Sequence, residues 1–206
     1  MIAPFEVRIK CLLYEIWQRG MDWEEYLPED LQHKWMGWCD EDGMLNEIVI
    51  PRNCLPCFGK QMTEVQVFCD SLPRAYGAVA YLRYFDITGK FRVSFFISKS
   101  RMAPLKTLTL PRFELVAVVI GFRVGEYLEG VYNKVVGEFV FWTDSLMALH
   151  WVRGNTKRWK QFMEDRVAEV QEKSNLRDWF YCPPVDNPVD LLTRDVSVEN
   201  LMSSQT

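Results

Sequence analysis

The sequence has no long apolar run and no dense cluster of cysteines. None of its 206 residues fall in a stretch approaching the ~18–20 apolar residues of a membrane-spanning helix. The N-terminus MIAPFEVRIK lacks the apolar core of a secretory signal, and the six cysteines lack the spacing of a disulfide framework. These absences exclude a membrane partner and secretion, and they predict an intracellular protein of the cytoplasm or nucleus.

Positive charge is also scarce over the chain as a whole. Lys and Arg number 24 against 28 Asp and Glu, and the net charge of −4 argues mildly against a nucleic-acid partner. The charge is unevenly distributed, because residues 1–50 hold 4 bases and 11 acids whereas residues 51–206 hold 20 bases and 17 acids. The acidity therefore belongs mainly to the first fifty residues, and the rest of the chain suits phosphate contact.

Only one cysteine pair, Cys54 and Cys57, has a suggestive spacing. A zinc site there would recruit His33 or Cys39, and a redox site would need the pair to open a helix after a strand. The chain has no second C-x-x-C motif, and the neighbouring prolines indicate a loop. We therefore expect ordinary loop or buried thiols.

The first sixty residues have a helical pattern. Apolar residues recur at helical spacing over residues 5–17, and Pro28 with the acids that follow it suits the first turn of a second helix. Residues 51–63 carry prolines and a glycine, as a linker does. We predict a helical connection segment and linker over residues 1–60 and a second domain over residues 61–206.

The second domain alternates strands with helices. With 49% hydrophobic and 25% charged residues the chain can bury a full core. The predicted order is strands at 65–69, 78–85 and 91–97, a helix at 114–128, a strand at 138–143, helices at 144–152 and 159–173, a strand at 179–182 and a final helix from 189. The turn at 86–89 makes the second and third strands a hairpin. We expect an α/β fold whose sheet begins antiparallel and continues parallel.

Four acidic residues stand at the ends of these predicted elements. Asp70 and Asp144 end strands, and Glu114 and Asp190 lie in the first turns of helices. If the first and fourth strands are neighbours, Asp70 and Asp144 share one crevice. Close carboxylates repel unless a cation neutralises them, and oxygen ligands favour Mg²⁺. Since any one of these acids also suits a helix cap, the set of four carries the prediction of a metal site.

Four sequence blocks surround these acids: VFCDSLPRAYGAVAYLR, SKSRMAPLKTLTLPRFELVAVV, FWTDSLMALHWVRGNTKRWKQF and VDNPVDLLTR. In order and spacing they resemble the ribonuclease H region of the BEL/Pao family of LTR retrotransposon Pol polyproteins. The N-terminal VRIKCLLYEIW and GMDWEEYLPEDL are similar to the segment that connects the reverse transcriptase to that region. The resemblance implies a ribonuclease H-like mixed five-stranded sheet flanked by helices, with an N-terminal helical appendage.

The same resemblance implies an endonuclease that hydrolyses the RNA strand of RNA–DNA hybrids with two Mg²⁺ ions, or Mn²⁺ in their place. It places the catalytic and metal-ligating roles on Asp70, Glu114, Asp144 and Asp190. Asp70 would bridge both ions, with Glu114 and Asp144 on one and Asp190 on the other. Two such ions clamp the attacking and leaving oxygens of an in-line displacement. A reverse transcriptase polymerase domain is the implied protein partner.

The chain departs from wider family patterns in three respects. It contains no polymerase palm, and neither C-D-S-L nor W-T-D-S-L has the glycine that an aspartic protease needs after Asp-Ser. The only histidines are His33 and His150, so the loop before Asp190 lacks the histidine found in many cellular ribonucleases H. This last difference bears on turnover more than on metal binding.

Basic residues gather beside the predicted site. Between residues 87 and 123 there are seven bases and the single acid Glu114, and a second cluster near residue 157 mixes bases with aromatics. Such residues can grip backbone phosphates, and the ordinary alternative is a solvated loop. The predicted nucleic-acid-binding residues are Lys99, Arg101, Lys106, Arg112, Lys157, Arg158 and Lys160.

Two other functions stay open at this point. A decayed or co-opted Pol fragment could keep the fold and the basic face as a non-catalytic nucleic-acid-binding or scaffold module. An integrase-like strand transferase also uses a carboxylate site, although the W-T-D-S and N-P-V-D blocks fit it poorly.

Overall fold

The computed structural model describes residues 2–49, 63–86, 88–104, 109–132, 136–155, 160–190 and 197–203. Some predictions fall outside these ranges: the Cys54–Cys57 motif, the linker, the domain boundary at residue 60 and the basic residues Lys106, Lys157 and Arg158. They stay predictions.

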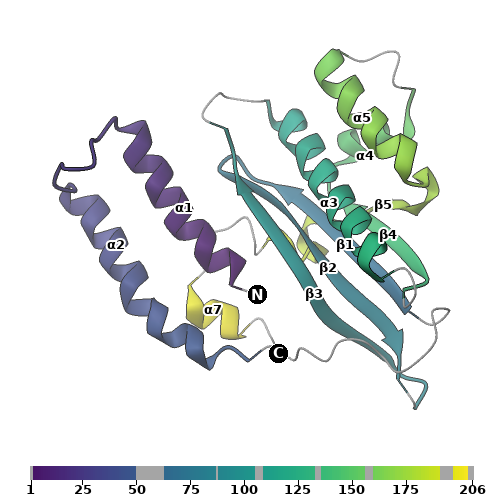
Figure 1. The fold of residues 1–206 in the computed structure, drawn as a ribbon, viewed down its shortest axis with the longest axis horizontal. Coiled ribbons are helices and arrows are strands. Elements are labelled where there is room, and N and C mark those ends of the chain that lie inside the picture. The colour runs from purple at the N-terminus through teal and green to yellow at the C-terminus, as the bar shows by residue number, and fades with distance from the viewer. Residues whose placement is uncertain are drawn as a thin grey trace.

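The described strands form one mixed sheet of five, in the order β3-β2-β1-β4-β5 (Figure 1). Their bounds are β1 Thr63–Ser71, β2 Ala75–Phe85, β3 Phe91–Met102, β4 Glu138–Thr143 and β5 Trp179–Tyr181. The β1–β2 and β2–β3 pairs are antiparallel, whereas β4 runs parallel to both β1 and β5. The antiparallel beginning, the parallel continuation and the hairpin at 86–89 are therefore confirmed.

The third strand is longer than its sequence pattern predicted. It continues to Met102 through the charged residues Lys99 and Arg101, where a strand ending at residue 97 was expected. Because β3 is an edge strand, alternate side chains can face water, and charged residues there also hinder pairing with another chain. The extension puts Lys99 and Arg101 on a strand instead of a loop.

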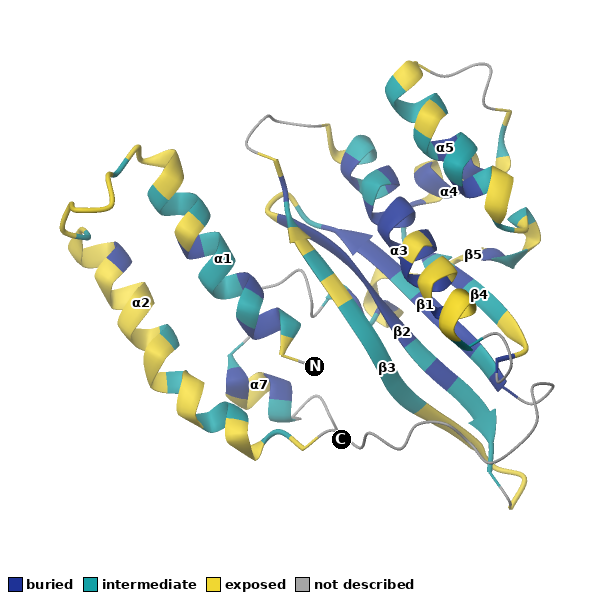
Figure 2. Cartoon of the chain, viewed as in Figure 1, coloured by how far each residue is buried: buried dark blue, intermediate teal, exposed yellow. Residues whose placement is uncertain are grey.

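One face of the sheet is covered by helices. The long helix α3, Leu110–Tyr132, packs directly on β1 and β2, and α4 Leu146–Arg153 and α5 Gln161–Lys173 lie beside it (Figure 1). A Cβ added at Gly125 would lie 2.6 Å from the ring of Phe141, so glycine allows α3 this close approach to β4. Figure 2 shows the resulting layer as the largely buried faces of α3, β1 and β2.

The opposite face carries a row of aromatic side chains, one from each strand. Neighbouring rings lie 5.3 to 6.1 Å apart along the series Phe95, Tyr81, Phe68, Trp142 and Phe180. After β5 the chain forms a short helix at Pro184–Asp186. It then reaches Val189, which packs on Val79 of this aromatic face. The chain therefore passes over the face of the sheet opposite α3 just before Asp190.

The N-terminal helices form a hairpin beside β3. Helix α1, Ala3–Gln18, turns at Gly20, whose φ of 69° suits glycine, and α2 Glu29–Asp42 continues into a short helix at Gly43–Glu47. The C-terminal helix α7, Val198–Ser203, joins them, because Val198 and Leu201 are buried against Phe5 (Figure 1). The backbone N–H of Val198 donates to Glu41 at 2.9 Å, and Glu41 also pairs with Arg8 at 2.6 Å.

The predicted apolar stripe of α1 is only partly used for this packing. Phe5 and Leu12 are buried, but Leu13 and Trp17 are 49% and 69% exposed. The buried face of α1 is therefore narrower than the apolar stripe in its sequence. None of the described helices is long and apolar enough to cross a membrane.

Candidate active site

Asp70 and Asp144 meet at one edge of the sheet. Strand β1 pairs with β4 in parallel, and the last paired residues are Cys69 and Thr143. Asp70 and Asp144 follow directly, so the two carboxylates leave neighbouring strands at the same level. Asp70 is 8% exposed and Asp144 is half-buried. The condition for a shared crevice, that the first and fourth strands are neighbours, is therefore met.

Glu114 is brought to this edge by the first turns of α3. Its carboxylate accepts a hydrogen bond from the Ser145 hydroxyl, which lies directly after Asp144. The same hydroxyl accepts from the backbone N–H of Ala148 at 3.0 Å and caps α4. Ser145 therefore ties α3, the end of β4 and the start of α4 together around the carboxylates.

The pKa of Asp144 shows that the neighbouring acids interact with it. Burial raises the pKa of Asp144 to about 7, and the negative charges of Asp70 and Glu114 add to the rise, while a hydrogen bond from Asn187 opposes it. The pKa of the buried Cys69 thiol is also raised, first by burial and then by the charge of Asp144. Three carboxylates thus converge in a place where their repulsion is poorly screened.

Asp190 is connected to the same edge through Asn187. The Asn187 amide donates to the carbonyl oxygen of Cys69 at 3.2 Å, and the Asn187 side-chain oxygen accepts from the N–H of Val189 at 3.2 Å. The Asn187 carbonyl accepts from the N–H of Asp190 at 3.2 Å. Asn187 is thus bonded to the end of β1, and the turn holds the backbone of Asp190 three residues further along the chain. The Asp190 side chain is half-buried.

The predicted ligands suit a hard divalent cation in kind, since all four offer carboxylate oxygens. Within the described ranges, no three His, Cys, Asp or Glu side chains already stand in a metal-holding arrangement. The carboxylates are turned to protein donors instead: Asp70 accepts from the N–H of Ser71 at 2.5 Å, Glu114 from Ser145 and Asp144 from Asn187. The donor set fits the ion, because a carboxylate that accepts one protein hydrogen bond keeps further oxygen lone pairs for a cation.

Two polar residues of the site were missed by the sequence reasoning. Ser145 and Asn187 are only 5% and 4% exposed, and each bonds two different partners at the carboxylate edge. Both stand inside the quoted blocks W-T-D-S and N-P-V-D. The available signal was a small polar residue within three positions of each acid, directly after Asp144 and three residues before Asp190.

Some of the described basic residues are exposed, and others form ion pairs with acids of the protein. Lys99 and Arg101 are exposed on β3, at the end of the sheet where Ser100 pairs with Gly77 and Gly77 with Asp70. Lys160 is exposed just before α5. The Arg112 guanidinium lies 5.2 Å from the ring centre of Phe162, an arrangement that leaves its hydrogen-bond donors usable.

Two bases of the larger predicted cluster have protein partners instead. Arg92 pairs with Asp86 at 2.8 Å, and Arg123 makes a two-pronged pair with Glu169 at 2.6 and 2.9 Å. The pKa of Asp86 is lowered, by the Thr88 hydroxyl first and then by Arg92. These two arginines stabilise the hairpin and the α3–α5 contact.

The sequence and the fold were compared with known proteins. The profile of the family described as Pao retrotransposon-like RNaseH-like domain matches residues 1–145, well over half of the chain. No curated protein matches the sequence.

Several solved structures are similar to this chain at low sequence identity. LC11-RNase H1 in complex with an RNA/DNA hybrid matches 70% of this chain and 99% of its own, with 11% identity and a TM-score of 0.40. RNase H1 from the archaeon Halobacterium salinarum matches 68% and 98%, with 11% identity and a TM-score of 0.36. The foamy viral protease-reverse transcriptase in complex with dsDNA matches 86% of this chain and 33% of its own, with 11% identity and a TM-score of 0.47.

Proposed function

Because the chain belongs to the family of Pao retrotransposon-like RNaseH-like domains, we propose that it hydrolyses the RNA strand of RNA–DNA hybrids by two-metal-ion catalysis. The observation that carries the proposal is the convergence of Asp70, Glu114 and Asp144 at the ends of β1, β4 and α3. Burying like charges together is unfavourable, so such a cluster is typical of a site that binds a cation.

The carboxylates would divide the ions between them. Asp70, Glu114 and Asp144 would hold one ion, and Asp70 with Asp190 would hold the second. When bound, the two divalent cations would activate the attacking water and neutralise the leaving oxygen. Magnesium is the proposed cation because its preferred ligands are oxygens, and manganese would substitute for it.

The surrounding residues orient these ligands. Ser145 holds the Glu114 carboxylate toward Asp144, and Asn187 holds the turn before Asp190 against the end of β1. Neighbours of this kind fix a ligand's rotamer before the ion arrives. We infer that both act as positioning residues for the metal ligands.

The hybrid would lie across the end of the sheet that carries Lys99 and Arg101, with Arg112 beside Glu114. Exposed lysine and arginine fix a nucleic-acid backbone through its phosphates without reading sequence. In this family setting we propose a reverse transcriptase polymerase domain as the protein partner, which would deliver the hybrid.

The direct test is hydrolysis of an end-labelled RNA–DNA hybrid by the full chain in Mg²⁺. We expect Asp144→Asn to lower the rate more than about a hundredfold, since even the outer partners of metal ligands are worth 10- to 100-fold. The control is Asp186→Asn, which removes an exposed acid from the loop before Asp190 and should cut normally. Equal cutting by Asp144→Asn, or no cutting by the wild type, contradicts the proposal.

A second candidate is a nucleic-acid-binding module without catalysis. The observation that favours it is the engagement of the described carboxylates with protein donors, with no three of them ready for a metal ion. This candidate predicts hybrid binding with a steep salt dependence and no cleavage product at any Mg²⁺ or Mn²⁺ concentration.

A further inference from the structure

An apolar groove lies at the end of the α1–α2 hairpin, outside the carboxylate site. Its cavity has a volume of about 590 Å³ and is lined mainly by Leu13, Trp17, Met21, Trp23 and Leu27 of the hairpin and by Met102 of β3. Trp23 is 89% exposed, and the adjacent Tyr26 is 99% exposed. Large apolar side chains gathered in one exposed hollow are typical of a surface that another molecule covers.

Helix α1 has apolar side chains that the fold buries and others that it leaves exposed. Phe5 is buried against α7 and the end of the hairpin, and Val7 and Leu12 are buried as well. Leu13 and Trp17 are one helical turn apart on the groove side, and both are exposed. Side chains at this spacing form a ridge against which a second helix can pack.

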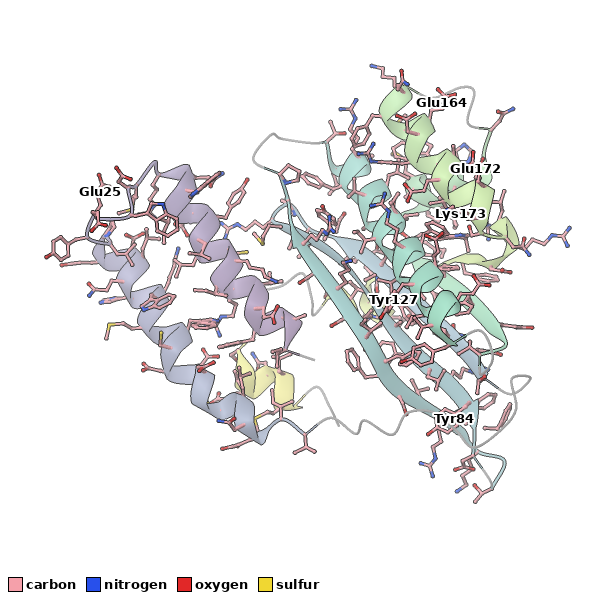
Figure 3. The ribbon with its side chains drawn as sticks, in the orientation of Figure 1. Glu25, Tyr84, Tyr127, Glu164, Glu172 and Lys173 are labelled. Carbon is pink, nitrogen blue, oxygen red and sulfur yellow. The ribbon has the colours of Figure 1, made fainter. Side chains whose placement is uncertain are left out.

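The rim of the groove is negatively charged. Residues 21–30 contain five acids and no base, and two of these acids, Asp22 and Glu25, line the groove. Figure 3 labels Glu25 at this end of the hairpin. Lys10 also lines the groove, but Lys10 and the nearby Arg19 of α1 are both paired with acids. Arg19 pairs with Asp30 at 2.5 Å and with Glu15 at 2.7 Å, and Lys10 pairs with Glu6 at 3.1 Å.

We propose that this groove binds an amphipathic protein helix with basic flanks. The apolar side chains of that helix would fill the cavity between Leu13, Trp17 and Trp23, and its lysines or arginines would face Asp22 and Glu25. Helix-in-groove recognition uses apolar anchors one turn apart, and complementary charge fixes the orientation. The acidic rim repels the phosphates of nucleic acids and of anionic lipids, so it disfavours both as occupants.

The proposal is independent of catalysis and can be tested with a defined peptide. The probe is a fluorescently labelled 14-residue helical peptide with leucines along one face and lysines elsewhere, and its partner peptide has glutamate in place of lysine. Binding to the full chain is measured by anisotropy at low and high NaCl. Hydrogen exchange then locates the protected amides.

We expect the lysine peptide to bind and to protect residues 10–27, and the glutamate peptide not to bind. Trp23→Ala should weaken binding at least about tenfold, as loss of a central aromatic anchor does. Glu25→Lys should also weaken it, and high salt should reduce the difference between Glu25→Lys and wild type because salt screens exposed charges.

Two control variants are matched to these changes. Met36→Ala removes an exposed apolar side chain of α2 outside the groove, and Glu172→Lys reverses an exposed acid on α5 (Figure 3). Both should bind like wild type. Because Trp23 and Glu25 are exposed, neither variant should unfold the chain, and circular dichroism checks this.

Other outcomes overturn the proposal. Equal binding of both peptides, or binding that Trp23→Ala and Glu25→Lys leave unchanged, would mean that the groove is not the site. A concentration-dependent dimer that Trp23→Ala dissociates would identify a second copy as the occupant, and binding to neutral phosphatidylcholine vesicles would identify a lipid surface.

Discussion

The repulsion at the carboxylate edge predicts that Asp144→Asn stabilises the metal-free protein. In the folded chain the pKa of Asp144 is raised from its ordinary 3.8 to about 7, by burial first and then by Asp70 and Glu114. Well below pH 3.8 the carboxyl is protonated in both the folded and the unfolded chain, so it does not affect stability. As the pH rises toward 7 the unfolded chain releases its proton while the folded chain retains it, and stability is lost.

The size of the effect follows from the same pKa values. A rise from 3.8 to about 7 corresponds to at most about 4 kcal/mol of lost stability above neutral pH. Because Asp144 is partly exposed, solvent screens part of this, and about 2 kcal/mol is the magnitude we expect. Asparagine has the shape of the acid without its charge, so Asp144→Asn should recover that amount at pH 8 and only a small part of it near pH 4.

The assay is urea unfolding and thermal unfolding followed by circular dichroism, in EDTA, at pH 4 and at pH 8. At pH 8 the gain should appear as a Tm about 4–8 °C higher for Asp144→Asn. Asp186→Asn, at an exposed acid, is the control and should change stability little at either pH. The reasoning fails if Asp144→Asn is no more stable than wild type at pH 8, or if it gains equally at pH 4.

Three further predictions concern Ser145 at the site, Phe5 in the contact between α1 and α7, and the basic residues. Ser145→Ala should cost about 1–2 kcal/mol in urea unfolding, because Ala148 loses its cap and Glu114 its donor, and an unchanged midpoint would contradict this. Phe5→Ala should cost about 3–5 kcal/mol and speed amide exchange in Val198–Ser203, and unaltered exchange there would show that α7 does not depend on Phe5. Arg101→Ala should weaken hybrid binding and lower its salt slope by about one, whereas Arg123→Ala should leave both unchanged because Glu169 already holds Arg123, and equal effects would refute the distinction.

Much of the fold follows from local sequence patterns. Runs of β-branched and aromatic residues predict the strands. The hairpin turn near Gly89 is also predictable, because Asp, Thr and Gly are common in turns. The far end of β3 was missed, since Lys99 and Arg101 look like loop residues until the strand is known to be an edge. A strand can contain charged residues when it lies at the edge of a sheet. Its position in the sheet depends on distant parts of the chain, so the local sequence does not reveal it.

The sequence by itself determined the order of the elements and the position of each acid at an element end, because both depend on residues close together in the chain. Only the tertiary structure decided that β1 and β4 are neighbours, so that Asp70 meets Asp144. It also decided that Arg123 is held by Glu169, 46 residues away, and is not available for phosphate. Likewise, the outer face of α1 stays exposed because no described element covers it. These outcomes depend on which distant surfaces pack together, and packing is set by the whole chain at once.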